Sequence, residues 1–479
     1  MFRRTIFILS FTSTSNVRSF LRLTPNRHSY SIKKIYFNYI SSYLQTPRLF
    51  PTSPRRYIHA ASDDFQENTC DSFESNLRFS LTQVLKGRPT DIGTILLLTI
   101  RILEFYDAPE PLQSACHIIA FTLQENNDIH DTPILWEDNL FANLLQILEP
   151  IMETHCDDLT ITTNKTSVDL ESFLLLLPST LTSFTTSNTL PILHRKLTTQ
   201  QMNHLVSMLI RRIKKEPLQY IFEKWDFFDF TLKVRRPCLC PRPETEELVH
   251  YVSQDLQRMI VSRRSKGEGV LIHGKEVKQK KIRILDVGSG TGAIGIALAR
   301  LFPNDVQVVA IDVKKEAVDL SMENAHLLLP KDSITMQHDS LYQAILCSAS
   351  DYKNTFNPIY NFEFDVIVSN PPYIPLADMT LLTEDVVNYE DADALCGGTD
   401  GMDVIRTIIK RLKEWCNDSD PGNESICWME VDPSQPHKIQ QMVSHRESIS
   451  SHTIRYVESR KDLRGLDRFV KLTIHQVLR

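Results

Sequence analysis

Residues 282–295 read I-R-I-L-D-V-G-S-G-T-G-A-I-G, an apolar run that ends in closely spaced glycines. The apolar run predicts a buried strand, and T-G-A-I-G-I-A-L-A-R-L-F (291–302) predicts the helix that follows it. The whole chain has only 14 glycines in 479 residues, and four of them lie in this stretch. A glycine-rich turn from strand to helix lets a ligand approach the backbone and the helix N-terminus. The stretch therefore predicts an α/β fold with a ligand-binding loop.

Six further β-rich runs follow this strand, and helical segments separate the earlier ones. Alternating strands and helices, with strands that are apolar throughout, indicate a parallel sheet covered on both faces. Only the last two runs are closely spaced, which predicts an antiparallel final strand. The fold expected is a seven-stranded, mostly parallel α/β sheet, with further strands at VQVVAID (306–312), SITMQ (333–337), FDVIVSN (364–370), ICWMEV (426–431), HTIRYVE (452–458) and DRFVKLTI (467–474).

The glycine loop predicts a nucleoside-containing cofactor. Asp312 lies 20 residues after Gly292 at the end of the second strand, where a carboxylate accepts hydrogen bonds from ribose hydroxyls. NAD and S-adenosylmethionine both remain open on this pattern. The spacing favours S-adenosylmethionine, because an acid stands two residues before the first of three alternating glycines. A G-x-G-x-x-G pattern that starts at this first glycine, Gly288, fails at Ala293 and fits only if it starts at Gly290. The candidate cofactor-binding residues are Gly288, Ser289, Gly290, Thr291, Gly292 and Asp312.

The fourth strand ends in N-P-P-Y, residues 370–373. Open α/β sheets bind ligands at this edge, and two successive prolines make the loop stiff and free of two N–H donors. Asn370 Oδ1 and the Pro371 carbonyl could each accept a hydrogen from a planar –NH2 group, while Pro372 stiffens the loop and Tyr373 stacks on that group. Asn370 would also border the cofactor. Such a site orients an amide nitrogen for methyl transfer and needs no metal and no covalent intermediate.

The N-terminal part divides by composition. Residues 1–62 hold ten of the 53 Lys and Arg residues and no Asp or Glu, which is typical of a mitochondrial transit peptide. A secretory signal and an untargeted basic tail are the weaker alternatives. Residues 63–215 are expected to form a helical docking domain, with a flexible Thr/Ser-rich insertion at 154–190. Residues 216–240 alternate as in a β-hairpin linker, and 241–479 form the catalytic domain.

Charge and cysteine content exclude several classes of protein. Residues 63–479 contain 43 basic residues and all 59 acidic residues of the chain, which gives them a formal charge of −16. This acidic charge argues against stable nucleic-acid binding. No stretch approaches the ~20 apolar residues of a membrane span. The nine cysteines form no CxxC pair, so a zinc ribbon or disulfide framework is not expected. The expected form is a monomer.

The chain resembles the HemK family, the glutamine N5-methyltransferases of peptide-chain release factors. The resemblance covers roughly residues 215–475. The motifs that carry it are E-P-L-Q-Y (216–220), P-R-P-E-T-E-E-L-V (241–249), L-D-V-G-S-G-T-G-A-I (285–294), S-N-P-P-Y-I (369–374), Y-E-D-A-D-A-L-C-G-G-T-D-G-M (389–402) and D-L-R-G-L-D-R (462–468).

The resemblance implies a class I S-adenosylmethionine-dependent fold and methylation of the glutamine in the Gly-Gly-Gln motif of a release factor. With the basic leader, the implied partner is the mitochondrial release factor and the implied compartment the mitochondrial matrix. It also implies that Asp339 faces the adenine and that Arg242 and Glu244 brace a cofactor lid. The chain departs from the family pattern at Ser340, where an aromatic is frequent, and at W-M-E-V-D (428–432).

Three other functions are weighed against this one. A DNA or RNA adenine N6-methyltransferase shares the NPPY loop but needs a basic face, which the acidic body does not offer. A non-catalytic S-adenosylmethionine-binding protein would not need the glycine loop, Asp312 and NPPY together. An NAD oxidoreductase has no use for NPPY.

Overall fold

The structure is a computed structural model of the whole chain, and it describes residues 92–124, 196–265, 271–272, 275–276, 280–334, 340–352, 363–416, 424–444 and 452–476. The chain divides into two compact units between Phe222 and Glu223. The predicted leader at 1–62 and the predicted insertion at 154–190 lie outside the described residues. In the described part, no helix is long and apolar enough to cross a membrane.

The N-terminal unit is built from packed helices, as the apolar spacing predicts. The contacting helices are α4 (Ile92–Phe105), α5 (Pro111–Gln124), α8 (Thr199–Ile213) and α9 (Leu218–Phe222). A capping box starts α8, because the Thr198 hydroxyl accepts from the Gln201 N–H while the Gln201 side chain accepts from the Thr198 N–H. Arg212 is buried in this unit and donates to the Ser114 hydroxyl (2.9 Å).

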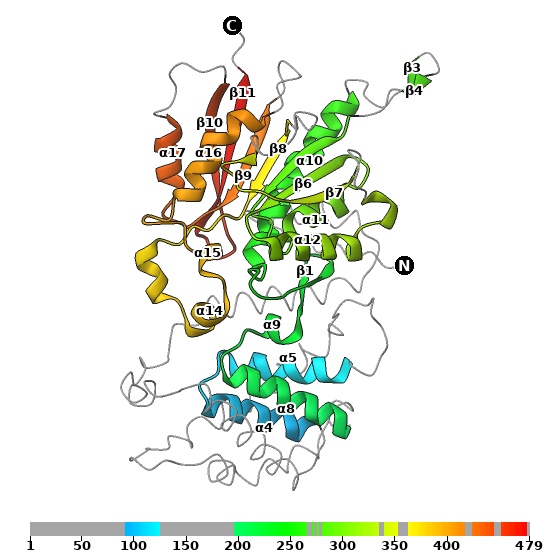
Figure 1. Cartoon of the computed structure of the whole chain (residues 1–479), viewed down its shortest axis with the longest axis vertical. Coiled ribbons are helices and arrows are strands. Elements are labelled where there is room, and N and C mark those ends of the chain that lie inside the picture. Colours follow the sequence, from blue (N-terminus) through cyan, green and yellow to red (C-terminus); the bar gives the residue numbers. More distant parts are fainter. Residues whose placement is uncertain are drawn as a thin grey trace, which may run out of the picture. The chain divides into compact units, whose positions relative to one another are not determined.

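The C-terminal unit holds a seven-stranded sheet in the order β10-β11-β9-β8-β5-β6-β7 (Figure 1). Strands β5 to β9 run parallel, and β11 lies antiparallel between β9 and β10. This order confirms the predicted mostly parallel α/β sheet and its antiparallel final strand. The strands are β5 (Ile282–Val287), β6 (Val306–Asp312), β7 (Tyr342–Leu346), β8 (Val366–Ser369), β9 (Ser425–Glu430), β10 (His452–Lys461) and β11 (Asp467–Gln476).

The third strand of the sequence prediction was wrong. The edge strand is β7, whereas Ser333 ends a short 3-10 helix, η5 (Lys331–Ser333). Pro330 precedes that turn, and the amide of Leu341 donates to the Ser333 carbonyl (2.7 Å), so the chain folds back before the strand begins. Residues 335–339 lie outside the described residues.

Helices cover both faces of this sheet. One face packs α10 (Pro243–Ser265), α11 (Ala293–Leu301) and α12 (Lys315–Leu328), and the other packs α16 (Asp403–Trp415) and α17 (Pro436–Ser444) (Figure 1). Leu285 and Val309 join the core under α16, while the alternating residues Ile284 and Val308 are equally buried. Because both faces of β5 and β6 are buried, these strands read as continuous apolar runs.

Shorter elements complete the unit. A hairpin joins β1 (Lys224–Phe227) to β2 (Phe230–Lys233), and β2 packs on α12. A second, very short hairpin joins β3 (Leu271–Ile272) to β4 (Lys275–Glu276). After β8 the chain passes through η7 (Leu376–Leu381), α14 (Glu384–Tyr389) and α15 (Ala392–Leu395) before it enters α16.

Candidate active site

Strand register brings the predicted binding loops to one edge of the sheet. Val287 at the end of β5 is paired with Ile311 on β6 and with Ser369 on β8, and Ser369 is paired with Met429 on β9. The Ser369 hydroxyl also donates to the Val287 carbonyl (2.7 Å). Neighbouring strands lie about 5 Å apart. The glycine loop, the NPPY loop and the acids that end β6 and β9 are therefore adjacent.

The glycine loop is held by its own backbone. Gly288, Gly290 and Gly292 have φ values of 75°, 53° and 82°, in the region that residues with a Cβ rarely adopt. The amides of Gly288 and Ser289 donate to the Ile311 carbonyl (2.9 and 3.1 Å), and the Gly292 amide donates to the Ser289 carbonyl (2.7 Å). These bonds fix the turn from β5 into α11.

Asp312 closes this loop from the next strand. Its carboxylate accepts the amides of Gly290 (2.9 Å) and Lys314 (3.0 Å). Burial raises the pKa of Asp312 above its usual value, and the backbone N–H bonds offset part of that rise. A carboxylate has about four lone-pair directions, so both oxygens keep acceptor capacity for ligand hydroxyls.

Asp286 lies beneath the same loop and is fully buried. Its Oδ2 accepts the Gly295 amide (3.0 Å) in the first turn of α11, while its Oδ1 has no hydrogen-bond partner among the described residues. Burial raises the pKa of Asp286 to about 7; the Gly295 amide offsets part of this rise and the nearby Asp312 carboxylate adds to it. An unpaired buried carboxylate oxygen at this point is available to a donor on a bound ligand.

The loop fits S-adenosylmethionine by shape and by chemistry. A Cβ added at Gly288 or Gly290 would meet nothing within 4 Å, so open space borders the backbone there. In the part of the chain that the structure describes, the buried Ser289 hydroxyl has no hydrogen-bond partner. Together with Asp312, these groups offer the polar contacts that a nucleoside and its amino-acid tail require. Asp339 lies outside the described residues, and the Ser340 hydroxyl donates to the Tyr342 carbonyl (2.7 Å).

The NPPY loop is supported by the second glycine cluster. A Cβ at Gly397 would lie 2.6 Å from the Pro372 carbonyl oxygen, and one at Gly401 would lie 2.2 Å from the Tyr373 carbonyl oxygen. The buried Gln435 side chain donates to the same Tyr373 oxygen (2.9 Å). Gly401 also has a φ of 76°, so both its backbone conformation and the close approach of the NPPY loop require glycine there.

Asn370 itself is held by side chains from two other elements. Its Nδ2 donates to Thr245 Oγ1 (3.2 Å) in the first turn of α10, and Thr245 Oγ1 donates to Glu430 Oε2 (3.0 Å) at the end of β9. Glu430 is buried, and burial raises its pKa to about 7. Burial also raises the pKa of Tyr373.

Segment 384–395, which contains α14 and α15, is fixed to the site by basic residues. Arg242 donates to the buried Glu390 carboxylate (2.5 Å), and Lys314 lies 2.8 Å from both Asp391 and Asp393. Arg236 donates to the Asn388 carbonyl (3.1 Å). Lys314 follows Asp312 closely, so this segment is tied to the end of β6.

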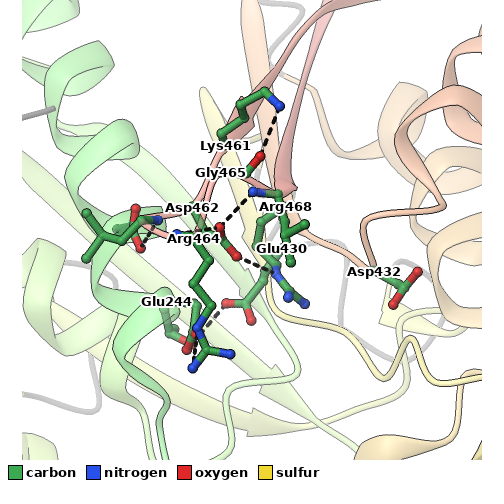
Figure 2. Close-up of polar contacts among 12 residues, drawn as sticks. Glu244, Glu430, Asp432, Lys461, Asp462, Arg464, Gly465 and Arg468 are labelled. Atoms are coloured by element: carbon green, nitrogen blue, oxygen red, sulfur yellow. Dashed lines mark hydrogen bonds and ion pairs between the residues drawn. The ribbon is translucent and has the colours of Figure 1, made fainter. Parts of the chain in front are cut away.

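Glu244, which the resemblance expects to brace a cofactor lid together with Arg242, has a different partner from Arg242. Its carboxylate instead lies 3.9 Å from Arg464 in the turn between β10 and β11 (Figure 2). Glu244 is the second residue of α10, and the helix directs it toward that turn while Arg242, just before the helix, faces Glu390. Asp462 orders the turn by accepting the amides of Arg464 and Leu466, each at 2.9 Å.

Several residues of this edge were not singled out from the sequence. Asn324 on α12 accepts the Lys233 amide (2.8 Å) and donates to the Thr291 carbonyl (2.9 Å), so it links the β1–β2 hairpin to the glycine loop. Thr245, Glu430 and Gln435 are the others. Thr245 was visible only as one letter of a motif, because its partners are distant in sequence.

Comparisons with known proteins give the family. The Methyltransferase small domain family matches residues 265–388. The chain is 33% identical over 276 residues to the MTRF1L release factor glutamine methyltransferase of Homo sapiens, covering 58% of this chain and 72% of that protein. It is 30% identical over 277 residues to the release factor glutamine methyltransferase of Thermodesulfovibrio yellowstonii, covering 58% of this chain and 83% of that one.

Solved structures are more distant. A ribosomal protein L11 methylase from Lactobacillus delbrueckii has a TM-score of 0.25 at 18% identity and covers 41% of this chain and 71% of its own. SMU.1697c from Streptococcus mutans, a putative methyltransferase in complex with SAH, has a TM-score of 0.25 at 14% identity. The match covers 41% of this chain and 89% of that chain. With scores this low, the class I fold rests on the strand order.

Sequence identity over most of a relative's length, the strand order and the fit of the glycine loop lead to the same conclusion. The chain belongs to the release factor glutamine methyltransferase family, whose members depend on S-adenosylmethionine.

Proposed function

We propose that this protein transfers a methyl group to the side-chain N5 of the glutamine in the Gly-Gly-Gln motif of a peptide-chain release factor. The observation that carries the proposal is the position of NPPY. It follows β8, directly beside the strand that leads into the glycine loop, so an amide held by NPPY would lie next to the cofactor.

The residues act by orientation. Asn370 Oδ1 and the Pro371 carbonyl each accept one hydrogen of the glutamine –NH2 group, and Tyr373 lies against the planar amide. An amide nitrogen is a weak nucleophile because its lone pair is delocalised, so holding it in line contributes much of the rate. S-adenosylmethionine supplies a methyl group bonded to a positively charged sulfur. The new N–C bond forms as the S–C bond breaks, and the nitrogen then loses one proton.

The cofactor is held on the other side by the glycine loop. In this proposal the residues Gly288, Ser289, Gly290, Thr291 and Gly292 surround its amino-acid part, Asp312 accepts its ribose hydroxyls, Asp339 faces its adenine and Asn370 borders its methyl group. In this proposal segment 384–395 covers the site; Lys314 ties it to the end of β6, and Arg242 ties it to the start of α10.

The test is methyl transfer to a release factor by the purified chain, followed by mass spectrometry of the Gly-Gly-Gln peptide. We expect the mass increase of one methyl group on that glutamine and none on DNA or RNA. Asn370→Ala should abolish transfer and leave the Kd for S-adenosylmethionine nearly unchanged. Asn388→Ala, an exposed position whose backbone carbonyl is the contacting group, is the matched control. Equal loss of transfer and cofactor binding in Asn370→Ala would contradict the clamp, and methylated adenine would assign a nucleic-acid substrate.

We further propose that the partner is the mitochondrial release factor, because residues 1–62 have the composition of a transit peptide. A fluorescent protein fused after these residues should enter mitochondria, and one fused after residues 63–120 should not. The N-terminal helices are our proposed docking element. Their removal should raise the KM for an intact release factor while leaving the KM for a short Gly-Gly-Gln peptide unchanged.

A further inference from the structure

Three side chains from three separate elements form a hydrogen-bonded row beneath the NPPY loop. Asn370 follows β8, Thr245 lies in the first turn of α10, and Glu430 ends β9. Asn370 Nδ2 is 3.2 Å from Thr245 Oγ1, which is 3.0 Å from Glu430 Oε2. Thr245 and Glu430 are 3% and 1% exposed, so water does not compete for these bonds.

Counting protons along this row fixes the direction of every bond. An ionised carboxylate only accepts hydrogen bonds, and a threonine hydroxyl has a single proton to donate. The Thr245 proton is therefore committed to Glu430, and Thr245 Oγ1 can only accept from Asn370. The –NH2 group is the only donor in the Asn370 side chain, so Nδ2 must point at Thr245 and Oδ1 must point away from it.

This orientation matters because the two ends of an asparagine amide have nearly the same shape and opposite chemistry. With Oδ1 directed away from Thr245, Asn370 offers an acceptor to a substrate –NH2 group. In the reversed orientation it would offer an –NH2 group to another –NH2 group, and no hydrogen bond could form. Nothing in the NPPY sequence itself selects between the two.

We propose that Thr245 and Glu430 are positioning residues that set the amide of Asn370 with its acceptor toward the substrate glutamine. Neither residue touches the reacting atoms; both act through Asn370. The inference rests on the proposed function, because it concerns how that site distinguishes an amide donor from an acceptor.

The hydrogen bonds from Asn370 through Thr245 to Glu430 have a single donor-to-acceptor direction only while Glu430 is ionised. Burial raises the pKa of Glu430 to about 7 and the carboxylate of Glu244 adds to the rise, whereas the hydrogen bond from Thr245 and the charges of Arg468 and Arg242 favour the ionised form. Figure 2 shows Glu430 with Arg468 and Glu244. Tyr373 also lies within electrostatic reach of Glu430. A protonated Glu430 could donate to Thr245, which would free the Thr245 proton to point at Asn370 and favour the reversed amide. Transfer should therefore increase as the pH rises through about 7.

The experiment compares Thr245→Val, Thr245→Ser and Glu430→Gln with the wild-type enzyme. Valine keeps the shape of threonine without the hydroxyl, and serine keeps the hydroxyl. We expect Thr245→Val to lower kcat/KM for a Gly-Gly-Gln peptide on the order of 10-fold to 100-fold, because misplaced amide contacts cost about this much. Thr245→Ser should restore most of the loss. Thr407→Val, which removes an exposed hydroxyl on α16, should change nothing.

A second readout avoids turnover. Peptide affinity measured with S-adenosylhomocysteine in place of the cofactor should weaken in Thr245→Val and not in Thr245→Ser, while the affinity for S-adenosylhomocysteine stays within about threefold in both. Glu430→Gln can donate or accept at Thr245, so it should lose the pH-dependent rise near 7 and keep a reduced, flat rate.

The outcomes separate this inference from the proposed function. A wild-type enzyme that leaves the Gly-Gly-Gln glutamine unmethylated overturns both. A wild-type enzyme that methylates it, with Thr245→Val and Thr245→Ser equally active, overturns the positioning role alone. If Thr245→Val fails to fold, the pH profile of Glu430→Gln decides: retention of the wild-type rise near pH 7 overturns the role of Glu430 and, with it, the inference.

Discussion

The glycine loop and the NPPY loop leave adjacent strands, yet they are held in different ways. The glycine loop is fixed by backbone amides and by Asp312 and Asp286 from the two strands that flank it. The NPPY loop is fixed from far along the chain, since Thr245 lies 125 residues before Asn370 and Gln435 lies 62 residues after Tyr373. The cofactor side is thus a local structure, and the substrate side depends on the whole sheet being assembled.

Two glycine substitutions, one beside each loop, should have the largest effects and should show whether the two loops are supported independently. A Cβ at Gly401 would lie 2.2 Å from the Tyr373 carbonyl oxygen and φ is +76°, so Gly401→Ala must displace the NPPY loop. We expect methyl transfer to fall by about 100-fold or more, because a small displacement of an orienting group has an effect of this size. Cofactor affinity, measured by calorimetry, should change by less than about threefold.

Gly288→Ala is the matched substitution on the other loop. Its φ is +75°, but the added Cβ meets nothing within 4 Å and projects into the open space beside the loop. We expect weaker cofactor binding with the affinity for a Gly-Gly-Gln peptide retained. If both variants lost cofactor and peptide binding to the same extent, the two loops would not be separate supports.

Asp312→Asn tests the cofactor side alone, with a smaller effect. Asparagine can still accept one of the amides of Gly290 and Lys314, but it loses the negative charge and one acceptor oxygen. A hydrogen bond to a charged group contributes about 1.5–3 kcal/mol, so the Kd for S-adenosylmethionine should rise on the order of 10-fold to 100-fold. Calorimetry without peptide measures this directly. An unchanged Kd would remove Asp312 from the cofactor site.

The difference between the loops also explains what the sequence could predict. The strand, the glycines and Asp312 follow one another closely, so their spacing alone indicates a binding loop. Thr245 and Glu430 are 185 residues apart, and their contact depends on β9 lying beside β8 and on α10 crossing that edge. No local pattern encodes that arrangement. The family motifs contained Thr245, and only the fold gives it a partner.

One error has a similar cause. Strand β7 was placed at SITMQ (333–337) because that run has high β-propensity, but residues 331–333 after Pro330 form a 3-10 helix and the strand forms at Tyr342–Leu346. Arg242 and Glu244 stand two positions apart in one motif and contact different partners, because Arg242 precedes α10 and Glu244 lies in its first turn.

Asp286→Asn tests the buried acid beneath the glycine loop through pH. The pKa of Asp286 is about 7 in the folded protein, whereas its ordinary value is 3.8. Ionisation of this carboxylate therefore lowers the free energy of unfolding; the loss begins near pH 4 and is complete above about pH 7. Removing the charge should stabilise the cofactor-free protein by up to about 4 kcal/mol at pH 8, since each pKa unit of the shift corresponds to about 1.4 kcal/mol, and have little effect near pH 4. Denaturant unfolding at the two pH values measures the difference.

The exposed Asp319 provides a control, because Asp319→Asn on the surface of α12 should change stability equally and weakly at both pH values. A stabilisation by Asp286→Asn that did not depend on pH would show that the effect comes from packing and not from the charge.

The smallest effect is expected at the ion pairs that tie segment 384–395 to the end of β6. Lys314 contacts Asp391 and Asp393 at 2.8 Å; its side chain is 35% exposed, and those of Asp391 and Asp393 are 15% and 77% exposed, so solvent screens the pair with Asp393 strongly and the pair with Asp391 in part. Lys314→Ala should lower kcat/KM only about twofold to threefold, since exposed ion pairs contribute about 0.2–1 kcal/mol. At about 1 M salt, where the Debye length is about 3 Å, the difference from wild type should disappear. Lys315→Ala, which removes a neighbouring exposed pair with Asp319, should have no effect at either salt concentration. A large loss in Lys314→Ala that persists at high salt would instead mean that segment 384–395 depends on this contact to cover the site. The substrate site would then depend on a residue that follows β6, next to the cofactor-binding Asp312.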